Sequence, residues 1–201
     1  MVYAAGMLRA DLCLASCLAS GLALTTFACG ETQHPSDAPI TMTATTTNAA
    51  PATNAAQPLT VGSPPPDFTA TASDGMVIHL QALKGKPVVV YFYPKDETPG
   101  CTKEACAFRD AWDGLAKSGV VLIGISADSN ESHQGFVLNH KLPFHLVSDP
   151  KGAIATSFGV PFDGYAARQS FVIGADGNVK KIYRKVDVSV HAQEIADDLK
   201  S

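Results

Sequence analysis

The sequence predicts an α/β fold in which a central β-sheet carries helices on both faces. Short runs of β-branched and aromatic residues alternate with segments of helical periodicity, and a β-hairpin followed by a helix ends the chain. The composition, with 46% hydrophobic and 17% charged residues among 201, fits one domain of ordinary size plus an additional segment. The formal net charge of −4 offers no electrostatic argument for binding nucleic acid.

Each predicted element follows from its local pattern. Residues 88–93 are β-branched and aromatic without polar alternation, which is typical of a buried strand. The next segment is helical, because apolar residues recur every three or four positions. The predicted order is strands at 68–70, 76–80 and 88–93, a helix from about 101 to 117, a strand at 120–126, a helix at 129–140, a strand near 144–147, a helix at 153–158, and then a hairpin and a helix.

The C-terminal hairpin is predicted to pair residues 169–173 with residues 179–183 across a Gly- and Asp-rich turn. The last helix is expected at 189–199. Ser129 is a suitable N-cap for the 129–140 helix, because a serine hydroxyl can accept a hydrogen bond from an unpaired N–H of the first turn. The sequence contains no visible internal repeat.

The first 29 residues have the pattern of an export signal. A run of apolar and small residues at 12–28 ends directly before Cys29. The segment Thr26-Phe27-Ala28-Cys29-Gly30 resembles the cleavage site of a bacterial lipoprotein, although Thr26 stands where an aliphatic residue is usual. We therefore expect residues 1–29 to be a lipoprotein signal with lipidation at Cys29. An uncleaved anchor and a plain secretory signal are the alternatives.

Residues 30–60 are rich in Thr, Ala and Pro and contain no Lys or Arg. Such a segment cannot bury enough apolar surface to offset the entropy of ordering, so we expect a disordered linker. A flexible coil of about 30 residues spans roughly 30 Å on average. We expect it to tether the folded domain at 61–201 to a membrane from an extracytoplasmic position, with the anchor or signal as the only membrane contact.

The stretch with the strongest chemical signal joins the 88–93 strand to the following helix. It reads Pro94-Lys95-Asp96-Glu97-Thr98-Pro99-Gly100-Cys101-Thr102-Lys103-Glu104-Ala105-Cys106. The Pro/Gly turn places Cys101 at or just inside the helix start. A helix N-terminus carries about half a positive charge and several unpaired N–H groups, so it stabilises a thiol in its nucleophilic thiolate form.

Cys106 follows Cys101 by five residues, and this offset limits what the two thiols can do. On one regular helix it corresponds to a rise of roughly 7.5 Å and a rotation of about 140°. The Cα atoms would then lie about 8–9 Å apart, beyond the roughly 7 Å limit for a disulfide without backbone movement. A disulfide would require the first turns to unwind, which suits a reactive and a resolving thiol that meet during turnover. Two inert buried cysteines are the alternative.

The pattern Pro94-x-x-x-Thr98-x-x-Cys101 resembles the active-site signature of the peroxiredoxins, which are thiol peroxidases with a thioredoxin-like fold. The resemblance covers about residues 60–200 and points to the peroxiredoxin Q, or bacterioferritin comigratory protein, group. It implies that Cys101, Thr98, Pro94 and Arg168 surround the peroxide and that Cys106 is the resolving cysteine. It also extends through Phe108-Arg109-Asp110, Gly124-Ile125-Ser126-Ala127-Asp128, Leu146-Val147-Ser148-Asp149 and Arg168-Gln169-Ser170-Phe171-Val172-Ile173.

This resemblance implies a reaction in which the Cys101 thiolate attacks the O–O bond of hydrogen peroxide or an organic hydroperoxide and becomes a sulfenic acid. Cys106 would then form an intrachain disulfide with Cys101, and a thioredoxin-like protein would reduce it. Arg168 would stabilise the thiolate, Thr98 would hydrogen-bond the peroxide, and Pro94 would stiffen the loop. No metal, haem or flavin is needed, and a monomer is sufficient because both thiols lie on one helix.

Two other functions fit the same thiols. One is an exported thiol–disulfide oxidoreductase that acts on proteins; it is disfavoured because such enzymes usually carry Cys-x-x-Cys, whereas four residues separate Cys101 and Cys106. The other is a peroxide sensor that passes its oxidation to a partner without turnover. Export also requires an extracytoplasmic reductant in place of cytosolic thioredoxin.

Overall fold

The structure, a computed structural model, describes residues 59–200. The expected signal at 1–29, the lipidation at Cys29 and residues 30–58 of the expected linker lie outside this part of the chain. Within residues 59–200, no helix is both long enough and apolar enough to cross a bilayer.

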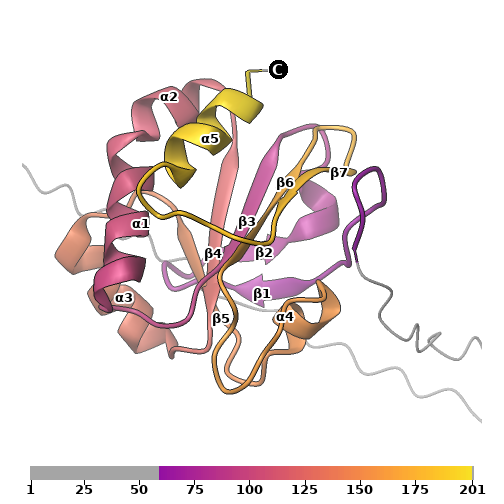
Figure 1. The fold of residues 1–201 in the computed structure, drawn as a ribbon. Helices are drawn as coiled ribbons and strands as arrows, with labels where there is room; N and C mark the ends of the chain where they lie inside the picture. Colours follow the sequence, from indigo (N-terminus) through magenta and orange to yellow (C-terminus); the bar gives the residue numbers. More distant parts are fainter. Residues whose placement is uncertain (1–58, 201) are drawn as a thin grey trace, which may run out of the picture. The chain divides into compact units, whose positions relative to one another are not determined.

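The described residues are built around a five-stranded mixed sheet with the strand order β5-β4-β3-β6-β7 (Figure 1). The central strand β3 is parallel to β4 and antiparallel to β6, while β4 is parallel to β5 and β6 is antiparallel to β7. All residues of β3 are buried, as expected for a strand covered on both faces. The strands are β3 (Val88–Phe92), β4 (Val121–Ser126), β5 (His145–Ser148), β6 (Gln169–Ile173) and β7 (Val179–Tyr183).

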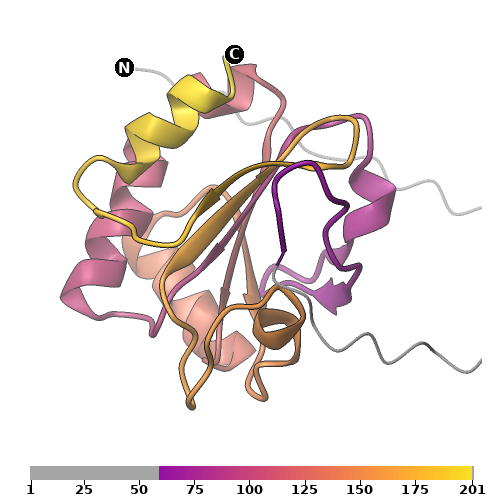
Figure 2. The same ribbon diagram turned by 45° about the vertical axis from the view of Figure 1, so that its right-hand side comes forward.

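Two apolar cores lie on opposite faces of this sheet, and Figure 2 shows the elements that cover the two faces. Tyr91 of β3 packs into the core with Phe108, whereas the next residue, Phe92, packs into the other core with Phe158. The first core lies under α1 (Pro99–Asp110), α2 (Trp112–Lys117), α3 (Asn130–His140) and α5 (His191–Asp198). The second lies under the hairpin of β1 (Thr69–Thr71) and β2 (Val77–His79), the 3₁₀ helix η1 (Leu80–Leu83) and α4 (Ala153–Ser157). The predicted α/β class, with helices on both faces, is confirmed.

The prediction of a single helix at about 101–117 is wrong in one respect, because this segment forms two helices, α1 and α2. The two helices meet at Ala111, whose φ of −85° and ψ of 0° depart from helical values. Hydrogen bonds nevertheless continue across this residue, from the Ala111 N–H to the Ala107 carbonyl and from the Leu115 N–H to the Ala111 carbonyl. The apolar spacing therefore persists through the bend, which is why periodicity did not reveal it.

The remaining boundaries agree closely with the predictions. The hairpin of β6 and β7 has the expected bounds, and Ser129 caps α3 by accepting a hydrogen bond from the Ser132 N–H. The last helix begins at His191 rather than at residue 189, because Ser189 binds Asp187 through both its N–H and its hydroxyl, in a turn outside the helix. The 3₁₀ helix η1 was not predicted.

Candidate active site

Cys101 lies in the first turn of α1, which follows β3 after the loop of residues 93–98. Pro99 occupies the start of the helix, where a missing N–H costs no intrahelical hydrogen bond, and Thr98 is the N-cap with extended dihedral angles. Cys101 is only 2% exposed and belongs to the core beneath α1. The predicted location at the helix start is therefore confirmed, in the turn whose N–H groups point outward without helical partners.

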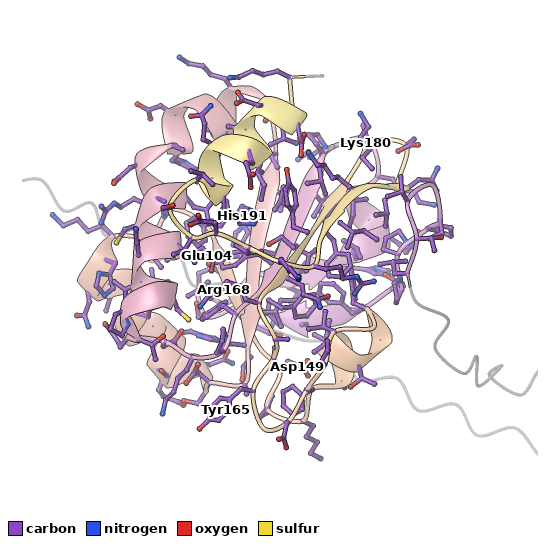
Figure 3. The ribbon with its side chains drawn as sticks, viewed as in Figure 1. Glu104, Asp149, Tyr165, Arg168, Lys180 and His191 are labelled. Atoms are coloured by element: carbon purple, nitrogen blue, oxygen red, sulfur yellow. The ribbon has the colours of Figure 1, made fainter. Side chains whose placement is uncertain are left out.

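Arg168 directly precedes β6, and strand pairing brings it to the same end of the sheet. Gln169 pairs with Phe92 in the antiparallel ladder between β6 and β3, so the residue before β6 lies beside the loop that leaves β3. The Arg168 Nη2 group donates a hydrogen bond to Cys101 Sγ over 3.1 Å. Its Nη1 group forms an ion pair with Glu104, and Figure 3 shows these two side chains next to each other beside α1.

The ion pair between Arg168 and Glu104 is largely shielded from water. The Glu104 side chain is 1% exposed and that of Arg168 is 19% exposed. Burial raises the pKa of Glu104 to about 7, because the cost of desolvating the carboxylate exceeds the attraction of Arg168. Burial alone would lower the pKa of Arg168, but the negative charge of Glu104 and the hydrogen bond to Cys101 raise it. The site thus holds a permanent cation against one sulfur and one carboxylate.

Thr98 and Pro94 lie in the loop between β3 and α1. Pro94 follows the buried Tyr93, which is the first residue after β3, and is partly buried. The Thr98 hydroxyl donates its proton to the Lys95 carbonyl over 3.0 Å. Because a hydroxyl has one proton and two lone pairs, Thr98 remains able to accept a hydrogen bond. The hydrogen bond expected between Thr98 and a peroxide is therefore one that the Thr98 oxygen accepts.

A buried carboxylate anchors this loop. Asp96 accepts hydrogen bonds from the hydroxyls of Tyr93 (2.8 Å) and Ser132 (2.7 Å), and its Oδ2 lies 2.9 Å from His133 Nδ1. Its own N–H donates to Asp128 over 2.9 Å. Although burial alone would raise the pKa of Asp96, these partners, His133 foremost, lower it. The carboxylate therefore stays ionised near neutral pH and ties the loop to α3 and to the end of β4.

Cys106 lies on the same helix as Cys101 but in different surroundings. It is partly exposed, whereas Cys101 is buried, and both thiols are free. Both residues fall within the continuous helix α1. This agrees with the prediction that the two cysteines are not joined while the helix is intact.

Sequence reasoning missed Glu104, although its position offered a signal. It lies three residues after Cys101, a spacing that places both side chains on one face of a helix. It also missed Tyr91, whose hydroxyl is buried without a hydrogen-bond partner among residues 59–200. Burial and the charge of Glu104 raise the pKa of Tyr91 well above its usual range, so this hydroxyl stays neutral.

The chain is similar in sequence and in structure to known proteins. The model of the AhpC/TSA family matches residues 61–182. The chain is 48% identical over 128 residues to a chloroplastic peroxiredoxin Q of Sedum lineare, covering 62% of this chain and 69% of that relative. It is 43% identical over 147 residues to the bcp peroxiredoxin of Coxiella burnetii, covering 69% of this chain and 97% of that relative.

A solved structure of the bacterioferritin comigratory protein of Xanthomonas campestris, studied for its alkyl peroxide reduction activity, is similar as well. It aligns with a TM-score of 0.63 at 33% identity, over 66% of this chain and 90% of that one.

Proposed function

Because this chain belongs to the AhpC/TSA family, and within it to the peroxiredoxin Q and bacterioferritin comigratory protein group, it is a thiol-dependent peroxidase, and we propose that Cys101 is its peroxide-reactive thiol. The observation that carries this proposal is the contact between Arg168 Nη2 and Cys101 Sγ at the buried start of α1. A guanidinium and a helix N-terminus both favour an anionic sulfur.

The first step is attack of the Cys101 thiolate on the nearer oxygen of a hydroperoxide. An S–O bond forms and the O–O bond breaks, so that Cys101 becomes a sulfenic acid and the other oxygen leaves as hydroxide or alkoxide. A proton then converts this leaving group to water or an alcohol. Arg168 stabilises the negative charge that passes from sulfur to oxygen, and Thr98 accepts a hydrogen bond from the peroxide O–H.

The second step is resolution by Cys106. Its thiolate attacks the sulfenic sulfur, which forms the Cys101–Cys106 disulfide and releases water after protonation. Because both cysteines lie within α1, the first part of the helix must unwind before the sulfurs meet. A thioredoxin-type dithiol protein then reduces the disulfide. A single chain contains both sulfurs, so a monomer is a sufficient unit.

Burial of Cys101 favours a small oxidant over a protein substrate. At 2% exposure its sulfur can be reached by a hydroperoxide, whereas the disulfide of a folded protein would need a more exposed thiol. The alkyl peroxide reduction of the Xanthomonas campestris relative supports organic hydroperoxides as substrates here, beside hydrogen peroxide. This argument sets the peroxidase above a general protein thiol–disulfide oxidoreductase.

The test is consumption of hydrogen peroxide and of cumene hydroperoxide by the full chain, with dithiothreitol as reductant. We expect turnover by the wild type and none above background by Cys101→Ser. When thioredoxin replaces dithiothreitol as the reductant, Cys106→Ser should react once with peroxide but should not be recycled. Unchanged turnover by Cys101→Ser would overturn the assignment of the reactive thiol, and unchanged recycling of Cys106→Ser would overturn the resolving role.

For the N-terminal part we propose an extracytoplasmic lipoprotein, with lipid on Cys29 and residues 30–60 as a tether. The support is the apolar run that ends at Cys29 and the composition of the following segment. In a bacterial host, the wild type should fractionate with membranes, and Cys29→Ser should not be processed at this position. Equal membrane association and processing of both proteins would contradict lipidation at Cys29.

A further inference from the structure

A second cluster surrounds the thiol of Cys106 on the more exposed side of α1. His140, the last residue of α3, places its Nδ1 atom 3.9 Å from Cys106 Sγ, at the outer edge of hydrogen-bonding distance for sulfur. The other ring nitrogen, Nε2, lies 2.9 Å from Glu97 Oε2. One imidazole therefore connects this thiol to a carboxylate.

The carboxylate determines which ring nitrogen carries the proton. An ionised carboxylate can only accept hydrogen bonds, and hydrogen bonds with His140 and Asn139 lower the pKa of Glu97. Glu97 is therefore ionised at neutral pH, and Nε2 of His140 must be the donor to it. In the neutral imidazole, Nδ1 then carries the lone pair that faces the Cys106 sulfur. This is the orientation required of a base toward a thiol proton.

Neighbouring elements hold the imidazole in place. Asn139 donates to Glu97 Oε1 over 2.9 Å, and Glu97 itself adopts a φ of +58°, an uncommon value for a residue other than glycine. From α1, Arg109 Nη1 donates to the His140 carbonyl over 2.9 Å. The charged groups around the ring are thus Glu97 from the loop and Arg109 from α1, which is itself paired with Asp110.

We propose that His140 is the general base of the resolving step and that Glu97 is its positioning residue. This proposal rests on the peroxidase function and on Cys106 as the resolving thiol. The proton moves from Cys106 Sγ to His140 Nδ1 while α1 is still folded. The thiolate then attacks the Cys101 sulfenic sulfur as the helix unwinds; the S–S bond forms, the S–O bond breaks, and the departing hydroxide takes up a proton to become water. The Cys106 sulfur is oxidised and the Cys101 sulfur is reduced.

The test separates oxidation from resolution in the full chain. After mixing with hydrogen peroxide, the rate of Cys101 oxidation depends on peroxide concentration, whereas disulfide formation is first order. Rapid quenching followed by mass spectrometry measures both. His140→Gln should oxidise at the wild-type rate but resolve about tenfold or more slowly near pH 7, because general-base catalysis is typically worth at least this factor. The difference should shrink as pH rises, because base from solution then removes the thiol proton without help from His140.

Matched variants make the result specific. Glu97→Gln, which removes the charge that orients the ring, should show a smaller loss with the same pH dependence. Leu138→Ala, at a position of α3 that is 76% exposed and has no role in the proposal, should resolve at close to the wild-type rate. A wild-type resolution rate in His140→Gln would overturn the proposal. A decrease in the resolution rate that is equally large at every pH would also overturn it, because such a decrease indicates altered helix unwinding. A wild type that fails to oxidise at Cys101 would instead overturn the peroxidase assignment.

Discussion

Arg168 and Glu104 form an ion pair in which the carboxylate is buried more deeply than the guanidinium. Glu104 lies one helical turn after Cys101, so a single guanidinium can reach the carboxylate with Nη1 and the sulfur with Nη2. The carboxylate therefore fixes the orientation of the group that contacts the reactive thiol. Its position links the packing of α1 to the chemistry of the site.

Replacing Arg168 by lysine should slow the reaction with peroxide although the positive charge is kept. A lysine ammonium is a point charge and cannot present two donors in a fixed plane to Cys101 and Glu104. We expect the second-order rate constant for Cys101 oxidation to fall by about 100-fold, the usual effect of losing one positioned donor to a developing anion. Stopped-flow measurement with hydrogen peroxide checks this.

A suitable control is Arg184→Lys. Arg184 donates to Gln169 over 2.7 Å and is not in the proposed site. Its rate constant should stay within about twofold of the wild type, as expected for a residue away from the reacting atoms. If Arg168→Lys reacted with peroxide as fast as the control, the fixed planar arrangement of the two guanidinium donors would be unimportant for the reaction.

Glu104 should make the stability of the protein depend on pH. Its pKa is raised from 4.5 to about 7, so between these values the folded state binds more protons at this group than the unfolded state. The resulting stabilisation is fully present below pH 4.5 and is lost as pH rises through 7. In Glu104→Gln this dependence is absent. The difference in unfolding free energy between the two proteins should change by about 3 kcal/mol from pH 4.5 to pH 8.

Urea unfolding at a series of pH values measures this difference directly. Because both proteins share every other titrating group, the subtraction isolates Glu104. A difference that stays constant across the range would mean that the carboxylate has its ordinary pKa in the folded protein.

The Thr98 hydroxyl should matter for peroxide and little for the fold. In Thr98→Val the group that accepts from the peroxide is gone while the shape is kept, and we expect Cys101 oxidation to slow by about 10- to 100-fold, the size of one or two lost hydrogen bonds. Thr98→Ser retains the hydroxyl and should react within about threefold of the wild type. Equal rates for the valine and serine variants would exclude a role for the hydroxyl.

Two glycine-to-alanine substitutions should change stability in opposite directions. A Cβ on Gly124 of β4 would lie 2.7 Å from Tyr91 and from Leu146, both of which are fully buried, so we expect a loss of about 1–3 kcal/mol. A Cβ on Gly114 in α2 would meet nothing within 4 Å, so Gly114→Ala should add about 0.5–1 kcal/mol through helix propensity. Denaturant unfolding measures the stability of both variants. A less stable Gly114→Ala protein, or a Gly124→Ala protein as stable as the wild type, would contradict the packing described.

The local parts of the site could be predicted from sequence, whereas its long-range contacts could not. The strand, the turn and the start of the helix around Cys101 are decided by neighbouring residues, and their predicted positions agree closely with the structure. Arg168 reaches Cys101 across 67 residues of sequence, only because β6 pairs antiparallel with β3; the family resemblance alone suggested it. The contact of His140 with Cys106 depends likewise on how α3 packs beside α1, which no periodicity encodes.

The most direct test of the central claim is to identify the sulfur that hydrogen peroxide oxidises first. The Cys106→Ser protein is treated with one equivalent of peroxide in the presence of dimedone, which traps sulfenic acids, and the adduct is located by mass spectrometry. We predict one dominant adduct, on Cys101. In the double variant Cys106→Ser/Arg168→Met, this adduct should be absent when the reaction time is kept short. An adduct spread evenly over the thiols of the chain, or none on Cys101, would contradict the account.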